Sequence, residues 1–357
     1  MLDFGEYIRN FGKIVVNFKV EESFDLQKLN DENYSTFWHE YMHYLQDITT
    51  FSGIMEMNYY FECLSEHTSN SFTYTYESDL KSTIIGVLEG DSSFTINNKK
   101  IIYPGEIEKI KTYTDGISRA ILSDTTSNIK NKNINASIQE LYVYYQDFPN
   151  NPLRFGYFCI RESMAYLMEK MLMCSKIDRD SEFPYNVCQS IVNCIYPNFS
   201  SNIMNIFALC EFSLNSSNPG VIFCVVLHDM KKQNFVPNNM EDFSEYLKKH
   251  YSDEFVHFEN KYPAKIEFLK NHLNEYFKND TNTQNAILKK YHLGCTFRCK
   301  DIIFISKLIE QNNHKTLLDT FGILLLQDSA NDIYTLKSDG FQPNNWMQLY
   351  YLSQYES

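Results

Sequence analysis

Two histidines four residues apart, His39 and His43, enclose Glu40 within residues 36–45. On an α-helix, positions i and i+4 lie one turn apart on the same face, so both imidazoles can face one Zn²⁺ ion. Glu40 could then act as the general base on the metal-bound water, whose pKa zinc lowers to about 7. The pattern therefore predicts metal-assisted hydrolysis.

The residues around this triplet carry no charge. Phe37, Tyr41, Met42 and Tyr44 are uncharged, and Leu45 is apolar. Such a pattern is typical of a helix that is buried nearly all round, where a His-Glu-His triplet is costly unless a metal satisfies it. Two histidines satisfied within an aromatic core are the alternative interpretation.

With Thr36 at its start, this segment resembles the extended consensus of the zincin metallopeptidases. A catalytic zinc site needs three protein ligands and an open fourth position, so the third ligand distinguishes the zincin families. A histidine six residues after His43 would indicate a metzincin, but that position is Thr49. Glu62, which follows a break at residues 49–53, fits a thermolysin-like arrangement and stays open as the third ligand.

Residues 161–169 favour another third ligand. They contain Glu162 and Ala165, which resemble the Glu-x-x-Ala element on the third-ligand helix of many gluzincins. An apolar stripe at helical spacing predicts a helix here, with Glu162, Ala165 and Glu169 aligned on a different face. The resemblance implies His39, His43 and Glu162 as zinc ligands, whereas a solvent-facing Glu162 is the alternative.

Further side chains could support such a site. Asp47 and Glu169 are candidates for accepting the second ring N–H of a ligating histidine, although both could equally be exposed carboxylates. A gluzincin also needs a donor for the tetrahedral oxyanion. Tyr157, Arg154 and His228 are the candidates for that role.

Composition limits the class of partner. The chain has 357 residues, of which 43% are hydrophobic and 15% aromatic, as expected of a globular protein. A net charge of −13, with no Lys/Arg run longer than a pair, disfavours nucleic acid as a partner. No secretion signal or membrane anchor is recognised, so we expect a protein that does not enter the membrane.

Nine cysteines without a disulfide framework favour a reducing cytoplasm. Cys295 and Cys299, with His292 nearby, weakly indicate a second metal site. Buried free thiols are the favoured interpretation of this pair.

Periodicity predicts the α+β class: a zincin-like, predominantly helical fold with a small antiparallel sheet. We expect a strand at residues 14–20, a first ligand helix capped by Asp31 or Ser35, and helices through most of the chain after about residue 158. Residues 1–235 should form the catalytic core, with a β-rich insert at about 70–145, and residues 236–357 a mostly helical, regulatory or partner-binding part. Within the insert we expect strands at residues 72–76, 94–96, 101–103 and 141–145 and a helix at 106–126.

The resemblance implies a zinc metallopeptidase that acts on a protein or peptide substrate, with a regulatory protein as a second expected partner. A prokaryotic toxin, stress or phage-defence protease is one such role. The alternatives are a catalytically silent zincin scaffold that binds or regulates, and a non-proteolytic zinc hydrolase.

Overall fold

The computed structural model describes residues 5–8, 12–20, 26–70, 117–129, 134–145, 153–172, 184–278, 280–336 and 343. The strands expected at residues 72–76, 94–96 and 101–103 lie outside the described residues, as does the first half of the helix expected at 106–126. None of the helices in the described part has the length and apolarity needed to cross a membrane.

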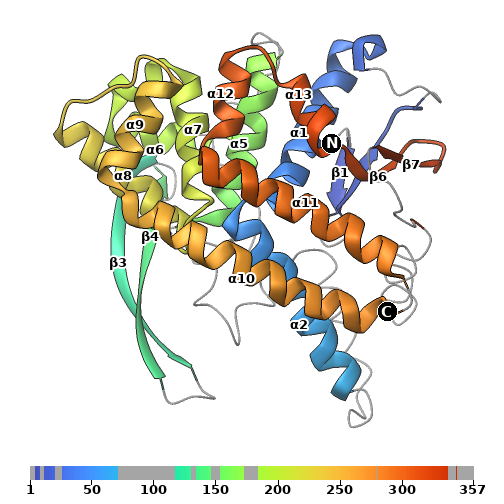
Figure 1. Cartoon of the computed structure of the whole chain (residues 1–357). Helices are drawn as coiled ribbons and strands as arrows, with labels where there is room; N and C mark the ends of the chain where they lie inside the picture. The colour runs from blue at the N-terminus through green and yellow to red at the C-terminus, as the bar shows by residue number, and fades with distance from the viewer. Residues whose placement is uncertain are drawn as a thin grey trace. The chain divides into compact units, whose positions relative to one another are not determined.

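Helices dominate the described residues, and two small sheets complete an α+β protein (Figure 1). The chain forms two compact units, one of residues 1–91, 258–300 and 313–357 and the other of residues 92–257 and 301–312. The limits of these units differ from the boundary expected near residue 235. Each unit gathers segments that are distant in sequence.

The first unit contains a four-stranded sheet in the order β1-β2-β6-β7. Its sheet is mixed, since β2 and β6 pair in parallel while the outer pairs are antiparallel, and the prediction of an antiparallel sheet was wrong here. The strand expected at residues 14–20 ends four residues earlier than predicted. The strands are β1 (Gly5–Ile8), β2 (Lys13–Val16), β6 (Ile323–Gln327) and β7 (Ile333–Leu336).

The long helix α1 (Asp31–Thr49) lies against β1 and β2. Its N-cap is Asn30, neither Asp31 nor Ser35 as predicted, because the Asn30 side chain accepts a hydrogen bond from the Asn33 backbone N–H at 2.8 Å. All fifteen residues from 35 to 49 are buried, which confirms the expectation of a helix buried nearly all round.

Extended backbone at Thr50 ends α1, and α2 (Phe51–Asn70) follows at once, as the expected break predicts. Two other helices hold the carboxyl end of α1. The Tyr262 hydroxyl of α10 (Ser252–Tyr276) donates to the Ile48 carbonyl at 2.8 Å, and the Arg298 guanidinium of α11 (Thr281–Lys300) donates to the Thr49 carbonyl at 3.1 Å. The remaining elements of this unit are the 3₁₀ turn η2 (Leu26–Lys28) and helix α13 (Lys315–Phe321).

The second unit combines a three-stranded antiparallel sheet with helices. Its strands are β3 (Ile117–Ile129), β4 (Ile134–Tyr145) and β5 (Leu153–Phe155). The strand expected at residues 141–145 is confirmed within β4, but the helix prediction is wrong over residues 117–126, because β3 pairs with β4 along its whole length. The helical elements are α5 (Tyr157–Leu172), α6 (Val187–Ile195), η3 (Pro197–Ser201), α7 (Ile203–Ser213), α8 (Pro219–Lys232), α9 (Met240–His250) and α12 (Phe304–Glu310).

Helix α7 forms the centre of this unit, and every residue from 204 to 213 is buried. Its Glu211 side chain is fully buried and accepts hydrogen bonds from the backbone N–H groups of Ile305 at 2.9 Å and Ser306 at 2.8 Å. These bonds satisfy the first amides of α12, which is how a buried carboxylate is tolerated here. Helix α5 packs against α7 and presents Glu162.

Candidate metal centre

Helix α1 buries the whole predicted triplet. His39, Glu40 and His43 are each at most 8% exposed. Because α1 is hydrophobic or uncharged around them, these polar side chains have little water to solvate them. Their burial therefore calls for a partner, either a hydrogen-bonding group or a cation.

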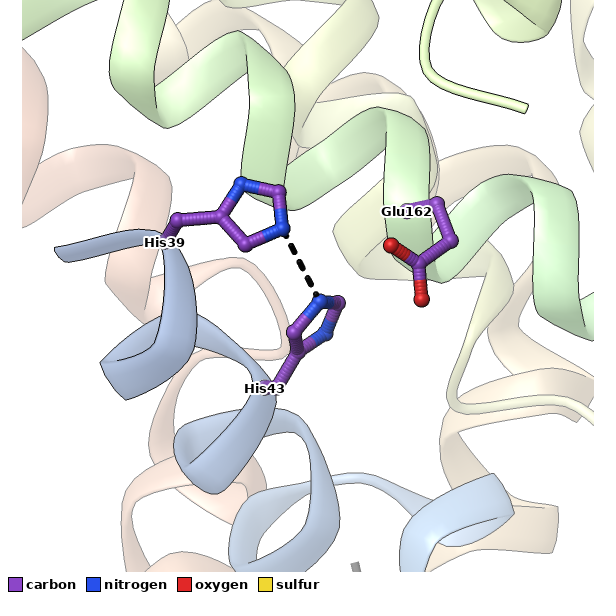
Figure 2. A group of neighbouring side chains, drawn as sticks. All are labelled: His39, His43 and Glu162. Atoms are coloured by element: carbon purple, nitrogen blue, oxygen red, sulfur yellow. Dashed lines mark hydrogen bonds between the residues drawn. The ribbon is translucent and has the colours of Figure 1, made fainter. Parts of the chain in front are cut away.

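The two imidazoles meet through their Nε2 atoms, which lie 3.2 Å apart (Figure 2). In a tetrahedral zinc site with Zn–N bonds of about 2.0–2.1 Å, two ligand nitrogens are separated by about 3.3–3.4 Å. The observed spacing thus fits a shared Zn²⁺ ion with almost no movement of either ring. A single hydrogen bond between the two nitrogens would give a similar distance.

Gln46 fixes the orientation of one ring. The Nδ1–H group of His43 donates to the Gln46 Oε1 atom at 3.0 Å, which leaves the Nε2 lone pair of His43 available to a metal. Sequence reasoning proposed Asp47 for this task and overlooked Gln46. The available signal was the i, i+3 spacing from His43, which brings the two side chains together on a helix.

Glu162 joins the histidines. Within the part of the chain that the structure describes, His39, His43 and Glu162 form the one group of three possible ligands whose donor atoms all lie within 4.8 Å of one another. Figure 2 shows the Glu162 carboxylate turned toward the two imidazoles. Glu162 is partly exposed, unlike the histidines. The side chain of Glu62 lies outside the described residues, so its candidacy as a ligand stays a prediction.

Strand β1 lies close over the base candidate. A Cβ atom placed on Gly5 would come within 3.2 Å of the Glu40 Cγ atom and 2.9 Å of the Thr36 Cγ2 atom, so a larger residue here would displace these side chains. Tyr7 lies two residues after Gly5, on the same face of β1. Its ring stacks on the His43 ring with centroids 6.2 Å apart. Sequence reasoning missed Tyr7, since no local pattern connects it with residue 43.

The other predicted site residues have different surroundings. The Tyr157 hydroxyl accepts a hydrogen bond from the Arg161 guanidinium at 3.0 Å, one turn along α5. His228 is exposed and lines a cavity of about 200 Å³ with mainly apolar residues of the second unit. Glu169 and Asp47 are both buried, so neither is the exposed carboxylate considered as the alternative. The Arg154 side chain lies outside the described residues.

Comparison with known proteins assigns this chain to no family. No family model matches the chain, no curated protein matches it, and no solved structure matches it. The functional argument therefore depends on the side chains alone.

Proposed function

We propose that this chain is a zinc-dependent metallopeptidase of the gluzincin type, in which His39, His43 and Glu162 hold the metal and Glu40 is the general base. The observation that supports the proposal is the grouping of two imidazoles and one carboxylate within 4.8 Å, with a glutamate next to the first histidine on a buried helix. Two neutral nitrogens and one carboxylate are a usual ligand set of catalytic zinc.

Zinc, when bound, supplies a Lewis acid and lowers the pKa of a coordinated water to about 7. Glu40 would accept the proton of that water and return it to the leaving amine, which needs a carboxylate beside the metal. Burial of α1 limits access of bulk water and so strengthens the charge interactions in the site. Gln46 would hold His43 in the tautomer that ligation requires.

Strand β1 favours a peptide substrate over a small molecule. Within the described residues β1 is at the edge of its sheet, and it lies against the helix that carries Glu40. An open strand edge can pair with an extended peptide through main-chain hydrogen bonds. This placement supports peptide hydrolysis more than the alternative of a non-proteolytic zinc hydrolase.

The test combines metal analysis with hydrolysis of a library of quenched fluorescent peptides. Wild-type protein purified without chelators should hold one zinc ion in the group of His39, His43 and Glu162, and His43→Ala should lose this ion because one of three ligands is gone. Glu40→Gln should keep the zinc and lose hydrolysis, since an amide cannot accept the proton. Wild-type and His43→Ala proteins that hold the same amount of zinc would refute the proposal. Zinc-loaded protein that cleaves no peptide would instead favour the silent scaffold.

The same experiment assigns the third ligand. Loss of a residue that hydrogen-bonds to a metal ligand typically weakens metal binding about 10–100-fold. Glu162→Gln should weaken zinc binding by more than this, whereas Glu62→Gln should leave it nearly unchanged. The opposite result would move the site to the thermolysin-like arrangement and leave the proposed hydrolysis intact.

A further inference from the structure

A pair of possible sulfur ligands lies on α11 in the first unit. Cys295 and Cys299 are one turn apart on α11, and their Sγ atoms are 3.9 Å apart. Cys295 is buried and Cys299 is exposed, so the pair is open to solvent on one side. The seven cysteines whose side chains the structure describes are free thiols.

Burial and one carboxylate both disfavour ionisation of this pair. Burial, the neighbouring Cys299 thiol and the Glu259 carboxylate raise the pKa of Cys295 to about 12. Burial and Glu259 also raise the pKa of Cys299, against a hydrogen bond from Cys295 that lowers it. Glu259 is an exposed residue of α10 whose negative charge acts on both thiols. The same negative charge attracts a cation.

The spacing of the two sulfur atoms fits a shared cation. In the thiol form the two Sγ atoms lie at hydrogen-bonding distance, 3.9 Å apart. A tetrahedral zinc ion with Zn–S bonds of about 2.3 Å separates two sulfur ligands by about 3.8 Å. The pair thus has the geometry of a chelate without any movement of α11.

We propose that Cys295 and Cys299 bind a thiophilic divalent cation such as Zn²⁺ or Cd²⁺ through both sulfur atoms, with Glu259 supplying compensating negative charge. Binding replaces the two thiol protons by one cation, so two protons are released to solvent for each ion bound. Water or a further side chain completes the coordination.

The position of the pair gives the site a structural consequence. The same two turns of α11 hold the end of α1: Arg298 donates to both the carbonyl and the hydroxyl of Thr49, and Gly294 lies against the Ile48 carbonyl. A cation that bridges Cys295 and Cys299 would stiffen these turns. We therefore expect binding to stabilise the first unit against unfolding.

The proposal is tested by titrating reduced, full-length protein with Cd²⁺ and following the ultraviolet charge-transfer absorption of cadmium thiolates. The His39, His43 and Glu162 group contains no sulfur, so this band reports on cysteine sites alone and its absence leaves the proposed peptidase untouched. Wild-type protein should show the band with release of about two protons per ion.

The exposed thiol gives the main variant, since Cys299→Ser changes little packing. Cys299→Ser should lose most of the band, and Glu259→Gln should weaken binding several-fold. Cys194→Ser is the matched control, because Cys194 is also exposed but lies on α6, and it should behave as wild type. The proposal is overturned if wild-type protein gives no band, if Cys299→Ser keeps it, or if Cys194→Ser abolishes it.

Discussion

Gln46 and His43 show how one hydrogen bond can orient a candidate metal ligand. The carboxamide oxygen of Gln46 accepts from Nδ1 of His43 at 3.0 Å, and both side chains are buried. A neutral imidazole has one N–H group, so this bond assigns the proton to Nδ1 and the lone pair to Nε2. Asp47, one residue further along α1, is buried too but lies about 100° around the helix from Gln46.

Gln46→Leu should weaken zinc binding about 10–100-fold, because it removes the acceptor that orients His43. Gln46→Glu keeps an acceptor at the same place and should retain most of the affinity. Asp47→Asn serves as the control and should have a smaller effect than Gln46→Leu. Competition with a chromogenic chelator measures all three. Equal losses of zinc affinity for Gln46→Leu and Asp47→Asn would indicate that Asp47 has the orienting role assigned here to Gln46.

The sequence predicts the centre of the candidate site better than its surroundings. His39, Glu40 and His43 are recognisable because a fixed helical spacing brings them together, whatever the rest of the fold. Tyr7 could not be predicted, since its contact with His43 arises from the packing of β1 on α1 across more than thirty residues of chain. Glu162 needed a family resemblance in addition to periodicity, because more than a hundred residues separate it from the histidines.

At the scale of elements, the position of α1 depends on a close approach by α11. A Cβ atom on Gly294 would lie 2.2 Å from the Ile48 carbonyl oxygen and 2.9 Å from the Thr49 Cα atom. Both are backbone atoms near the end of α1, and backbone cannot rotate away as a side chain can. Glycine at residue 294 is therefore required by packing.

Gly294→Ala should destabilise the protein by about 1–3 kcal/mol, the usual cost of overpacking, in spite of the roughly 0.5–1 kcal/mol that alanine gains over glycine within a helix. Thr296→Ala, an exposed change on the same helix, is the control and should stay within about 0.5 kcal/mol of wild type. Urea denaturation followed by helical circular dichroism measures both. An unchanged urea midpoint for Gly294→Ala would mean that α1 and α11 can move apart at little cost in free energy.

Helices with several turns of periodicity and the strand at residues 141–145 could be predicted from sequence, whereas β3 and α13 could not. The expectation of helices after about residue 158 is confirmed by α6, α7, α9 and α10, among others. Residues 117–121 have apolar side chains at helical spacing, but pairing with β4 makes them a strand, which is a tertiary effect. Helix α13 has seven residues, too few for periodicity to reveal.

At the scale of the whole chain, the first unit joins segments near both ends. Strand β2 pairs in parallel with β6, so residues 13–15 lie beside residues 325–327. Just after β6, the Asp328 side chain adds hydrogen bonds between the same two ends of the chain. One of its carboxylate oxygens accepts from the Val20 backbone N–H at 3.0 Å, and the other accepts from the Ala330 and Asp332 backbone N–H groups at 2.9 Å and 3.0 Å.

These bonds make stability depend on pH. Burial alone would raise the pKa of Asp328, but the three backbone donors outweigh it and hold the pKa below its usual value. A carboxyl whose pKa is lower in the folded state contributes stability that is fully present above its unfolded pKa of about 3.9. That contribution is lost as the pH falls through the lower, folded-state pKa. Asp328 should therefore stabilise the contact between the two ends of the chain at neutral pH and cease to do so in acid.

Asp328→Asn should lower the unfolding midpoint at pH 7, because the amide carries no charge and keeps a single acceptor oxygen for the three donors. The difference from wild type should narrow as the pH falls below about 4, where the wild-type carboxylate also becomes protonated. Asp332→Asn is the matched control in the same turn, since its side chain is exposed, and it should follow wild type at every pH. Thermal unfolding measured across the acid range tests this. A difference between Asp328→Asn and wild type that stayed constant down to pH values well below 4 would show that the charge of Asp328 contributes nothing, and that its shape alone holds the two ends of the chain together.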